Sequence, residues 1–339
     1  MKKHIQPLAL VLAAALMPMA ASCVKETAPT QGNYLLLNME KTDNPNSKMA
    51  IQDQLTLWSS NDQIWINGQN TPVRLLDEQT AWVSMPSLAS GESFIAFAPA
   101  NLITSSGMGG DYIFSGNDPK TVEVSFPSVY NYTYSGEGAS GRVIYEGIPL
   151  GTTAEASQAS LNFYHLSTLL NVELQNLSGT EITLDSVVIS GRYYLGDSIL
   201  PLSGWQQVRM YQTATAVPNS ATTTRNAKAE VVTPYAHTTL GCDRVTIVFE
   251  RDAITMANNT TKEIPVPIAP QKQLSATKKG VLTVRVCFHD SDGSAHAKIS
   301  TILSTGLYAA KRHAIHLRIK SSGNYGFGVE GFGGTEYLW

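Results

Sequence analysis

Short runs of apolar and aromatic residues, separated by turn-forming residues, recur along most of the chain. The first is Tyr34–Met39, and similar runs return about every ten residues. Asn67-Gly68 directly follows one of them, and this dipeptide is typical of a two-residue hairpin turn. Runs of this length and spacing predict an all-β chain folded as a sandwich or a barrel. The other runs in this half are 55–58, 64–66, 73–76, 81–85, 94–97 and 122–126.

The longest apolar stretch after the leader is 161–174, which is long enough for a helix. Its Asn, Ser, Thr and Val residues are poor helix formers, so two strands or one bent strand are expected. A turn sequence follows at 176–179, and we place a boundary there between an N-terminal domain (33–178) and a C-terminal domain (179–320). Further strands are expected at 182–189, 205–211, 229–232, 244–249, 264–268, 280–288, 296–303 and 314–319. Asp290–Gly293 should form a hairpin turn between two of them.

The last segment, 321–339, is rich in glycine with aromatic residues spaced through it. Tyr325, Phe327 and Val329 alternate with smaller or polar residues, so an extended chain would present them along one edge. Such a segment can add as a strand to another molecule. A flexible glycine-rich end is the alternative.

The first residues have the pattern of an export signal. Lys2 and Lys3 precede an apolar run at 5–17, which is too short to cross a membrane, and small residues follow. Cys23 directly after Ala-Ser resembles the lipobox of bacterial lipoproteins, although Ala20 stands where that box usually has leucine. The resemblance implies cleavage between Ser22 and Cys23 and a lipid on the Cys23 thiol. Ordinary cleavage near Ala21 is the alternative. We therefore expect a leader at 1–22 and a polar tether at 23–32.

The composition and charge of the chain limit which classes of partner it can bind. Charged residues make up only 15% of the 339 residues, and the formal net charge is -3. The chain has no basic stripe, which argues against nucleic acid as a partner. Beyond the leader the cysteines are Cys242 and Cys287. An exported setting permits a disulfide between them, and two buried thiols are the alternative.

No sequence signature of catalysis is present. The chain contains no G-x-S-x-G, no P-loop, no H-E-x-x-H and no dinucleotide-binding glycine motif after a strand. His165 lies inside an apolar run, where a core or edge position is expected rather than a catalytic base. His313 and His316 are three apart in a strand-like run and should point to opposite faces. We predict no catalytic residue and no cofactor.

Four residues around the Asp290–Gly293 turn could in principle hold a metal ion: His289, Asp290, Asp292 and His296. Asp and Gly are also what such a turn requires, so a solvated turn is expected and no metal is predicted. Trp58, Trp65 and Trp82 fit either a sugar-binding platform or a sheet core.

Four ordered segments resemble the fimbrillin family, the lipoprotein pilins of anaerobic bacteria. Residues 58–68 match its W-x-x-x-D-x-I-x-x-x-G opening, and 94–100 (FIAFAPA) are similar to its Y-x-A-x-Y-P-A strand. Residues 161–166 (LNFYHL) resemble its L-x-F-x-H-L strand, and 306–317 loosely resemble its closing G-x-x-Y-x-I-x-L with different spacing.

This resemblance implies two tandem β-sandwich domains of transthyretin-like topology and a role in type V pili. Family members reach the surface as lipoproteins, and a protease then removes the first strand so that a strand of a neighbouring subunit can replace it. Carried over, the tail around Tyr325, Phe327 and Val329 is the candidate donor. The candidate assembly strand is Tyr34, Leu35, Leu36, Leu37, Asn38 and Met39.

One feature departs from the family pattern. The family is cut after an arginine in the loop that follows the first strand, and here that loop offers only Lys41 and Lys48. The first arginine, Arg74, lies beyond further predicted strands. Either a different protease acts, or the strand is retained, which suits an anchor or a cap better than a stalk subunit.

The sequence thus predicts a non-catalytic structural component of a surface pilus that takes part in cell adhesion. Its expected partners are other pilus subunits, the outer membrane through the lipid, and ligands on host or bacterial surfaces. The alternative is a surface lipoprotein that binds glycans or peptides without polymerising.

Overall fold

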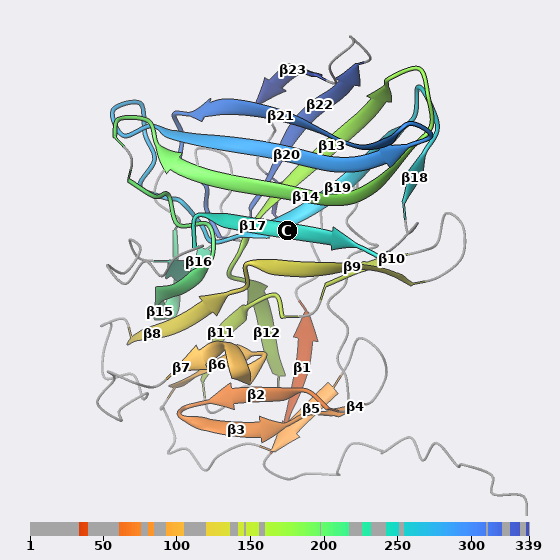
Figure 1. The fold of residues 1–339 in the computed structure, drawn as a ribbon. Coiled ribbons are helices and arrows are strands. Elements are labelled where there is room, and N and C mark those ends of the chain that lie inside the picture. The colour runs from red at the N-terminus through yellow and green to blue at the C-terminus, as the bar shows by residue number, and fades with distance from the viewer. Residues whose placement is uncertain are drawn as a thin grey trace, which may run out of the picture.

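The computed structural model describes residues 34–39, 61–75, 81–84, 93–104, 120–135, 142–145, 147–155, 160–196, 198–216, 226–231, 242–250, 254–309, 311–320, 326–332 and 337–338. Strands make up most of this part of the chain, and the helical element within it is a single 3-10 turn, Ala100–Leu102. The predicted all-β class is therefore confirmed. The strands form four sheets (Figure 1).

Sheet 1 contains the candidate assembly strand and is built from the N-terminal part of the chain. Its order is β3 (Gln69–Pro72), β2 (Gln63–Ile66), β6 (Ser93–Ala98), β11 (Leu150–Glu155), β12 (Ser160–His165), β1 (Tyr34–Met39), β5 (Ala81–Ser84) and β4 (Arg74–Leu75). Sheet 4 lies beside it, in the order β16 (Asn226–Val231), β15 (Gly204–Ala216), β8 (Lys120–Phe126) and β7 (Ile103–Thr104).

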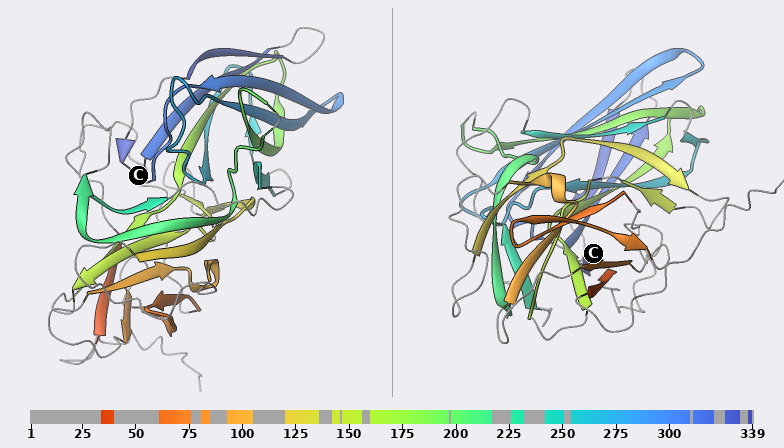
Figure 2. Two further views of the ribbon diagram at one scale, coloured as in Figure 1. Left: turned by 90° about the vertical axis from the view of Figure 1, so that its left-hand side faces the viewer. Right: turned by 90° about the horizontal axis from the view of Figure 1, so that it is seen from below.

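Sheets 2 and 3 form a sandwich at the end of the molecule away from β1 (Figure 2). The order of sheet 2 is β10 (Arg142–Ile144), β9 (Val129–Ser135), β17 (Arg244–Phe249), β14 (Ile182–Tyr193), β20 (Gly280–Asp290) and β21 (Gly293–Leu303), with β18 (Thr255–Met256) also on β14. The order of sheet 3 is β19 (Thr261–Ile268), β13 (Thr168–Leu177), β22 (Lys311–Lys320) and β23 (Gly326–Phe332), with β24 (Tyr337–Leu338) also on β22.

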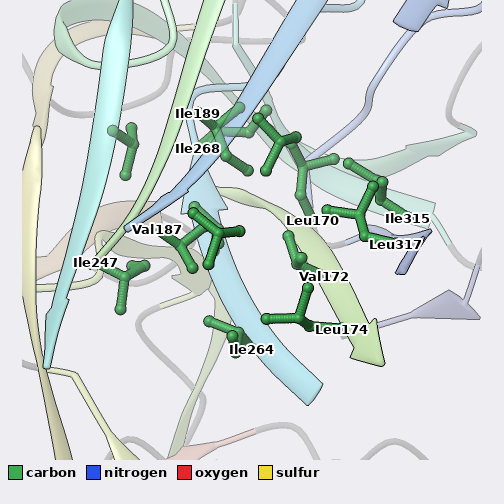
Figure 3. Close-up of a cluster of buried hydrophobic side chains, with 14 of the residues drawn as sticks. Leu170, Val172, Leu174, Val187, Ile189, Ile247, Ile264, Ile268, Ile315 and Leu317 are labelled. Atoms are coloured by element: carbon green, nitrogen blue, oxygen red, sulfur yellow. The ribbon is translucent and has the colours of Figure 1, made fainter. Parts of the chain in front are cut away.

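The core of this sandwich comes from alternate residues of facing strands. Leu170, Val172 and Leu174 of β13 are fully buried and face the same cluster as Val187 and Ile189 of β14 (Figure 3). Each such side chain contributes about 1.5–3 kcal/mol when it leaves water. Burial of every second residue is the period of a strand that has one face on a core.

β2 and β6 are buried on both faces. Ile64 and Ala96 belong to one apolar cluster with Phe163, whereas Trp65 and Phe97 belong to a second cluster shared with sheet 4. The rings of Trp65 and Phe97 lie 5.8 Å apart. These two strands therefore form a middle layer, so their sequences are nearly continuous in apolar residues.

Three sheets combine strands from both sides of the predicted boundary. β15 pairs with β8 in sheet 4, β17 pairs in parallel with β9 in sheet 2, and β13 pairs with β19 and β22 in sheet 3. A single cut between residues 178 and 179 would therefore divide all three sheets. Local patterns of apolar residues identify strands but do not reveal such distant pairing.

Several local predictions are confirmed. The stretch 161–174 forms two strands, β12 and β13, with the bend at Leu166 and Ser167. Asn67-Gly68 forms a two-residue turn with positive φ angles of 43° and 92°. Asp290 pairs with Gly293 in the hairpin of β20 and β21. Among the described residues, no helix is long and apolar enough to span a membrane.

Asn67 also connects the hairpin to its neighbour, because its Oδ1 accepts a hydrogen bond from the backbone N–H of Ile95 at 3.0 Å. We expect Asn67→Ala to lower the free energy of unfolding by about 2 kcal/mol, since a partly buried donor loses its partner and a β-carbon residue with no local hydrogen bond must keep φ positive. Urea unfolding measures the change. Asn67→Gly, which loses the bond but tolerates the φ angle, should cost less, and equal losses would contradict this account.

Candidate functional site

The candidate assembly strand β1 lies inside sheet 1, with a partner on each side. It pairs in parallel with β12 and antiparallel with β5. Leu36 lies opposite Ser160 on one side and opposite Trp82 on the other, while Leu37 lies opposite Leu161 and Ala81. The expected strand is therefore present with the predicted bounds, and both of its backbone edges are paired.

The partners of β1 are distant in sequence. The strand that follows β1 in the chain is β2, yet β2 pairs with β3 and β6. β1 therefore belongs to no hairpin in the described part of the chain, and it joins two strands, β12 and β5, that are far from it in sequence. Removing β1 would break no other ladder of sheet 1, but it would separate β5 and β4 from the remaining strands of the sheet.

Fully buried side chains flank the position of β1. Ala81 and Val83 of β5 are 0% exposed and Phe163 of β12 is 1% exposed, and all three belong to the apolar cluster of sheet 1. If β1 left, two unpaired strand edges would adjoin this cluster. Unpaired backbone groups beside apolar surface favour the binding of another strand.

His165 lies at the end of β12 and is buried, as predicted for a core residue. Burial lowers the pKa of His165 to about 3, so the imidazole is neutral near pH 7. The following residues lead into β13, and Leu166 donates its backbone N–H to the Pro149 carbonyl at 2.9 Å. The histidine therefore lies at a packed junction between sheets 1 and 3.

The first three residues of β22 form a buried polar cluster that the sequence analysis did not predict. Lys311, Arg312 and His313 are all at least 95% buried. Arg312 pairs with Glu263 at 2.8 Å, and Asn171 Nδ2 donates to the same Glu263 oxygen at 3.1 Å. From sequence alone, a run of Lys-Arg-His would be predicted to be exposed. Its burial depends on contacts with strands that are distant in sequence.

His313 and His316 lie on opposite faces of β22, as predicted. His313 is buried, whereas His316 is exposed and its Nδ1 lies 2.6 Å from Glu173 Oε2. Burial and the nearby Lys311 charge lower the pKa of His313 to about 4.

The tail pairs within its own chain. β23 runs antiparallel to β22, with Phe327 opposite Ile319 and Val329 opposite Leu317, and β24 pairs with the start of β22. The candidate donor segment is thus an edge strand of sheet 3 in this structure, with β22 as its paired neighbour. Tyr325 lies outside the described residues, as do Ser22, Cys23, Lys41, Lys48 and Trp58.

Trp65 does not belong to a surface platform. Its side chain is 4% exposed and packs in the core, while Trp82 on β5 is half-buried. A sugar-binding surface built on Trp65 is therefore ruled out, because both faces of β2 are covered.

Cys242 and Cys287 are free thiols, so the disulfide that an exported setting would permit is not formed, and the alternative of two unpaired thiols holds. Cys287 lies opposite Ser186 of β14, whereas Arg244, two residues after Cys242, lies opposite Ser190. This register separates the cysteines by about 20 Å along the sheet, and a disulfide needs Cα atoms within about 7 Å. Burial, with a smaller effect of the Asp243 charge, raises the pKa of the Cys242 thiol.

In the β20–β21 hairpin, which was considered as a metal site, the candidate ligands make other contacts. His289 Nδ1 lies 2.9 Å from Asp185 Oδ1, and Asp290 Oδ1 accepts the backbone N–H of Asp292 at 2.8 Å. Within the described residues, no three His, Cys, Asp or Glu side chains are grouped so that they could hold a metal.

Comparison with known proteins gives similarity in structure only. No family model and no curated protein matches the sequence. A candidate cell adhesion protein from Bacteroides ovatus aligns with 90% of this chain and 96% of its own, at 13% identity and a TM-score of 0.41. Candidate cell adhesion proteins from Bacteroides uniformis and Bacteroides fragilis align at 13% and 12% identity, with TM-scores of 0.36 and 0.37.

These two alignments cover 88% and 92% of this chain, and 98% and 95% of the others. At these identities and TM-scores, the similarity identifies neither a family nor a function. The functional argument therefore rests on the strand pairing described above.

The two buried histidines predict a dependence of stability on pH. Their pKa values in the folded chain are about 3 and 4, below the ordinary 6.5. The unfolded chain therefore binds these protons first, so the stabilisation is complete above pH 6.5 and is lost as the pH falls toward 4. Between pH 7 and pH 5 each histidine should remove about 2 kcal/mol from the free energy of unfolding.

Urea unfolding of His165→Leu at both pH values tests this expectation. The drop between pH 7 and pH 5 should be about 2 kcal/mol smaller than in the parent chain, whatever the absolute stability of the variant. His313→Leu provides a second, independent variant. An unchanged drop in both would show that these histidines do not control the pH dependence.

Proposed function

We propose that this chain is a non-catalytic structural subunit of a surface pilus that takes part in cell adhesion and assembles by strand donation. The observation that carries the proposal is the position of β1, which is paired on both sides in sheet 1 but belongs to no hairpin. A strand held in this way can be replaced by a strand of similar length from another molecule.

The free-energy cost of unpaired backbone groups favours replacing β1 with another strand over leaving its position empty. Without β1, the facing backbone groups of β5 and β12 lose their partners beside buried Ala81, Val83 and Phe163. A donated strand would pair both edges and cover the cluster again. The acceptor is therefore the position between β5 and β12.

The tail is the proposed donor. In its own chain β23 forms one ladder, with β22, whereas a strand between β5 and β12 would form two. Transfer from the edge of sheet 3 to the interior of sheet 1 would thus increase the number of paired edges. This gain offsets the loss of pairing at β22.

Anchoring and processing complete the proposal. We propose that Cys23 carries the lipid that holds the exported chain on the outer membrane, before any removal of β1. A cut after Lys41 or Lys48 would release the lipid together with β1 and produce a stalk subunit. A chain that keeps β1 would remain anchored and act as an anchor or a cap.

The proposal is tested by opening sheet 1 deliberately. A recognition site for a sequence-specific protease is placed between residues 41 and 48, and the purified chain is cut and transferred through mild denaturant to release β1. We expect ladders of polymer on gels of unheated samples from the cut chain and monomer from the uncut chain. Excess peptide of residues 34–39 should suppress the ladders, and a scrambled peptide should not.

The donor is tested in the same assay with His316→Cys and Gly331→Cys, which lie opposite each other in β22 and near the far end of β23. Oxidation should hold the tail on its own chain and block the ladders, and reductant should restore them. Cut chains that have lost β1 and stay monomeric would contradict the proposal. Ladders that form with the tail locked would exclude the tail as donor.

A further inference from the structure

The outer face of sheet 2 is the face directed away from the sandwich core. Val187 and Ile189 of β14 and Leu282 and Val284 of β20 point into the core, so the residues between them point outward. β14, β20 and β21 run side by side across this face (Figure 1). The register of the three strands places their outward residues in rows.

Exposed apolar side chains gather on this face and at its end. Seven large apolar side chains are markedly exposed among the described residues, and six of them belong here. They are Val129, Tyr194, Leu195, Ile199, Val248 and Ile302. Ile199 and Ile302 lie in one row with Arg192 and Val281 across four neighbouring chain segments.

Two cations face each other on the same face. Arg285 of β20 lies directly opposite Lys298 of β21, and both are exposed. Like charges in directly opposite positions destabilise a sheet. No ion pair joins either residue to a carboxylate within the described part of the chain. The arrangement therefore carries a cost within the chain that an anionic ligand would relieve.

The cations continue along the direction of β20. From Arg285 the outward positions lead past the hydroxyls of Thr283 and Ser300, which are 2.8 Å apart, to Arg192. The line ends at Lys279, whose Nζ lies 5.9 Å from the ring centre of Tyr194. Arg285 and Lys279 are six residues apart, so the line is about 20 Å long.

Two carboxylates near this line already have partners. Asp243 lies 3.6 Å from Arg244, and Asp185 Oδ1 lies 2.9 Å from His289 Nδ1. The line from Lys298 to Lys279 therefore has an excess of positive charge, although the whole chain has a formal net charge of -3. Charge complementarity favours an acidic partner.

We propose that the outer face of sheet 2 binds a linear acidic polysaccharide that lies along β20. A flat face with cations in a line fits an extended polyanion, whereas a small anion would require donors that converge on one point. Arg and Lys would bind the carboxylates or sulfates, and Thr283 and Ser300 would bind sugar hydroxyls. The exposed tyrosine and isoleucine side chains would contact the apolar faces of the sugar rings.

This inference deepens the adhesion part of the proposed function and rests on the surface location proposed there. It does not depend on strand donation, because the face is at the end of the molecule away from β1 (Figure 2). Binding by uncut monomer therefore tests it separately from polymerisation.

The experiment measures binding of the complete mature chain to polygalacturonate by calorimetry at low salt. Fully methyl-esterified polygalacturonate, which has the same backbone without charge, is the control ligand. We expect binding to the charged polymer, weakened by added salt, and none to the ester. Lys298→Glu should weaken binding about tenfold or more, because one cation is lost and Arg285 is neutralised.

The thermal midpoint of unfolding distinguishes a loss of binding from a loss of folded structure. Lys298→Glu places a carboxylate opposite Arg285, so its thermal midpoint should rise or stay unchanged while binding falls. The matched control is Lys320→Glu, which makes the same charge change at the exposed end of β22 in sheet 3. It should bind like the parent chain.

Several results would overturn the proposal. They are no binding to polygalacturonate, equal binding to its ester, or equal weakening by the two variants. Sedimentation in the absence of polymer adds one more: self-association that Lys298→Glu abolishes would assign this face to a second copy of the chain instead.

Discussion

The N–H and C=O groups along each edge of a strand must be paired or protected, and this requirement governs how the molecule is organised. β1 meets it on both sides through β5 and β12, which come from distant parts of the chain. In the proposed assembly, loss of β1 would leave these edges unpaired and favour the binding of another strand. Assembly of subunits and completion of the fold would then use the same backbone hydrogen bonds.

The edges of sheet 3 meet the requirement differently. On one side β19 carries Pro265 and Pro267, which lack N–H groups and so discourage further pairing. On the other side the tail covers β22. One edge is thus blocked by its sequence, whereas the other is covered by the segment that we propose as the donor.

Local features of the fold were predictable from the sequence because they depend on neighbouring residues. Asn67-Gly68 specifies its turn through positive φ angles, and the polar residues within 161–174 separate two strands. The bounds of β1 also followed from its apolar run. The histidine in 161–166 was expected in a core position, and its burial follows from the apolar residues around it.

Distant pairing was not predictable, since strands of similar composition can pair in many ways. Nothing in 129–135 indicates that β9 joins β17 beyond the expected boundary, and nothing in 311–313 indicates burial. The distance between Cys242 and Cys287 also depends on register across β14. The opposed Arg285 and Lys298 became visible only once β20 and β21 were aligned.

The central claim is that a donated strand replaces β1 in the assembled protein. The most direct test is the mass and N-terminal sequence of the chain recovered from surface polymers of intact cells. The account predicts a chain that begins at Thr42 or Met49, without lipid and without β1. A chain within those polymers that begins at a lipid-modified Cys23 and retains residues 34–39 would contradict it.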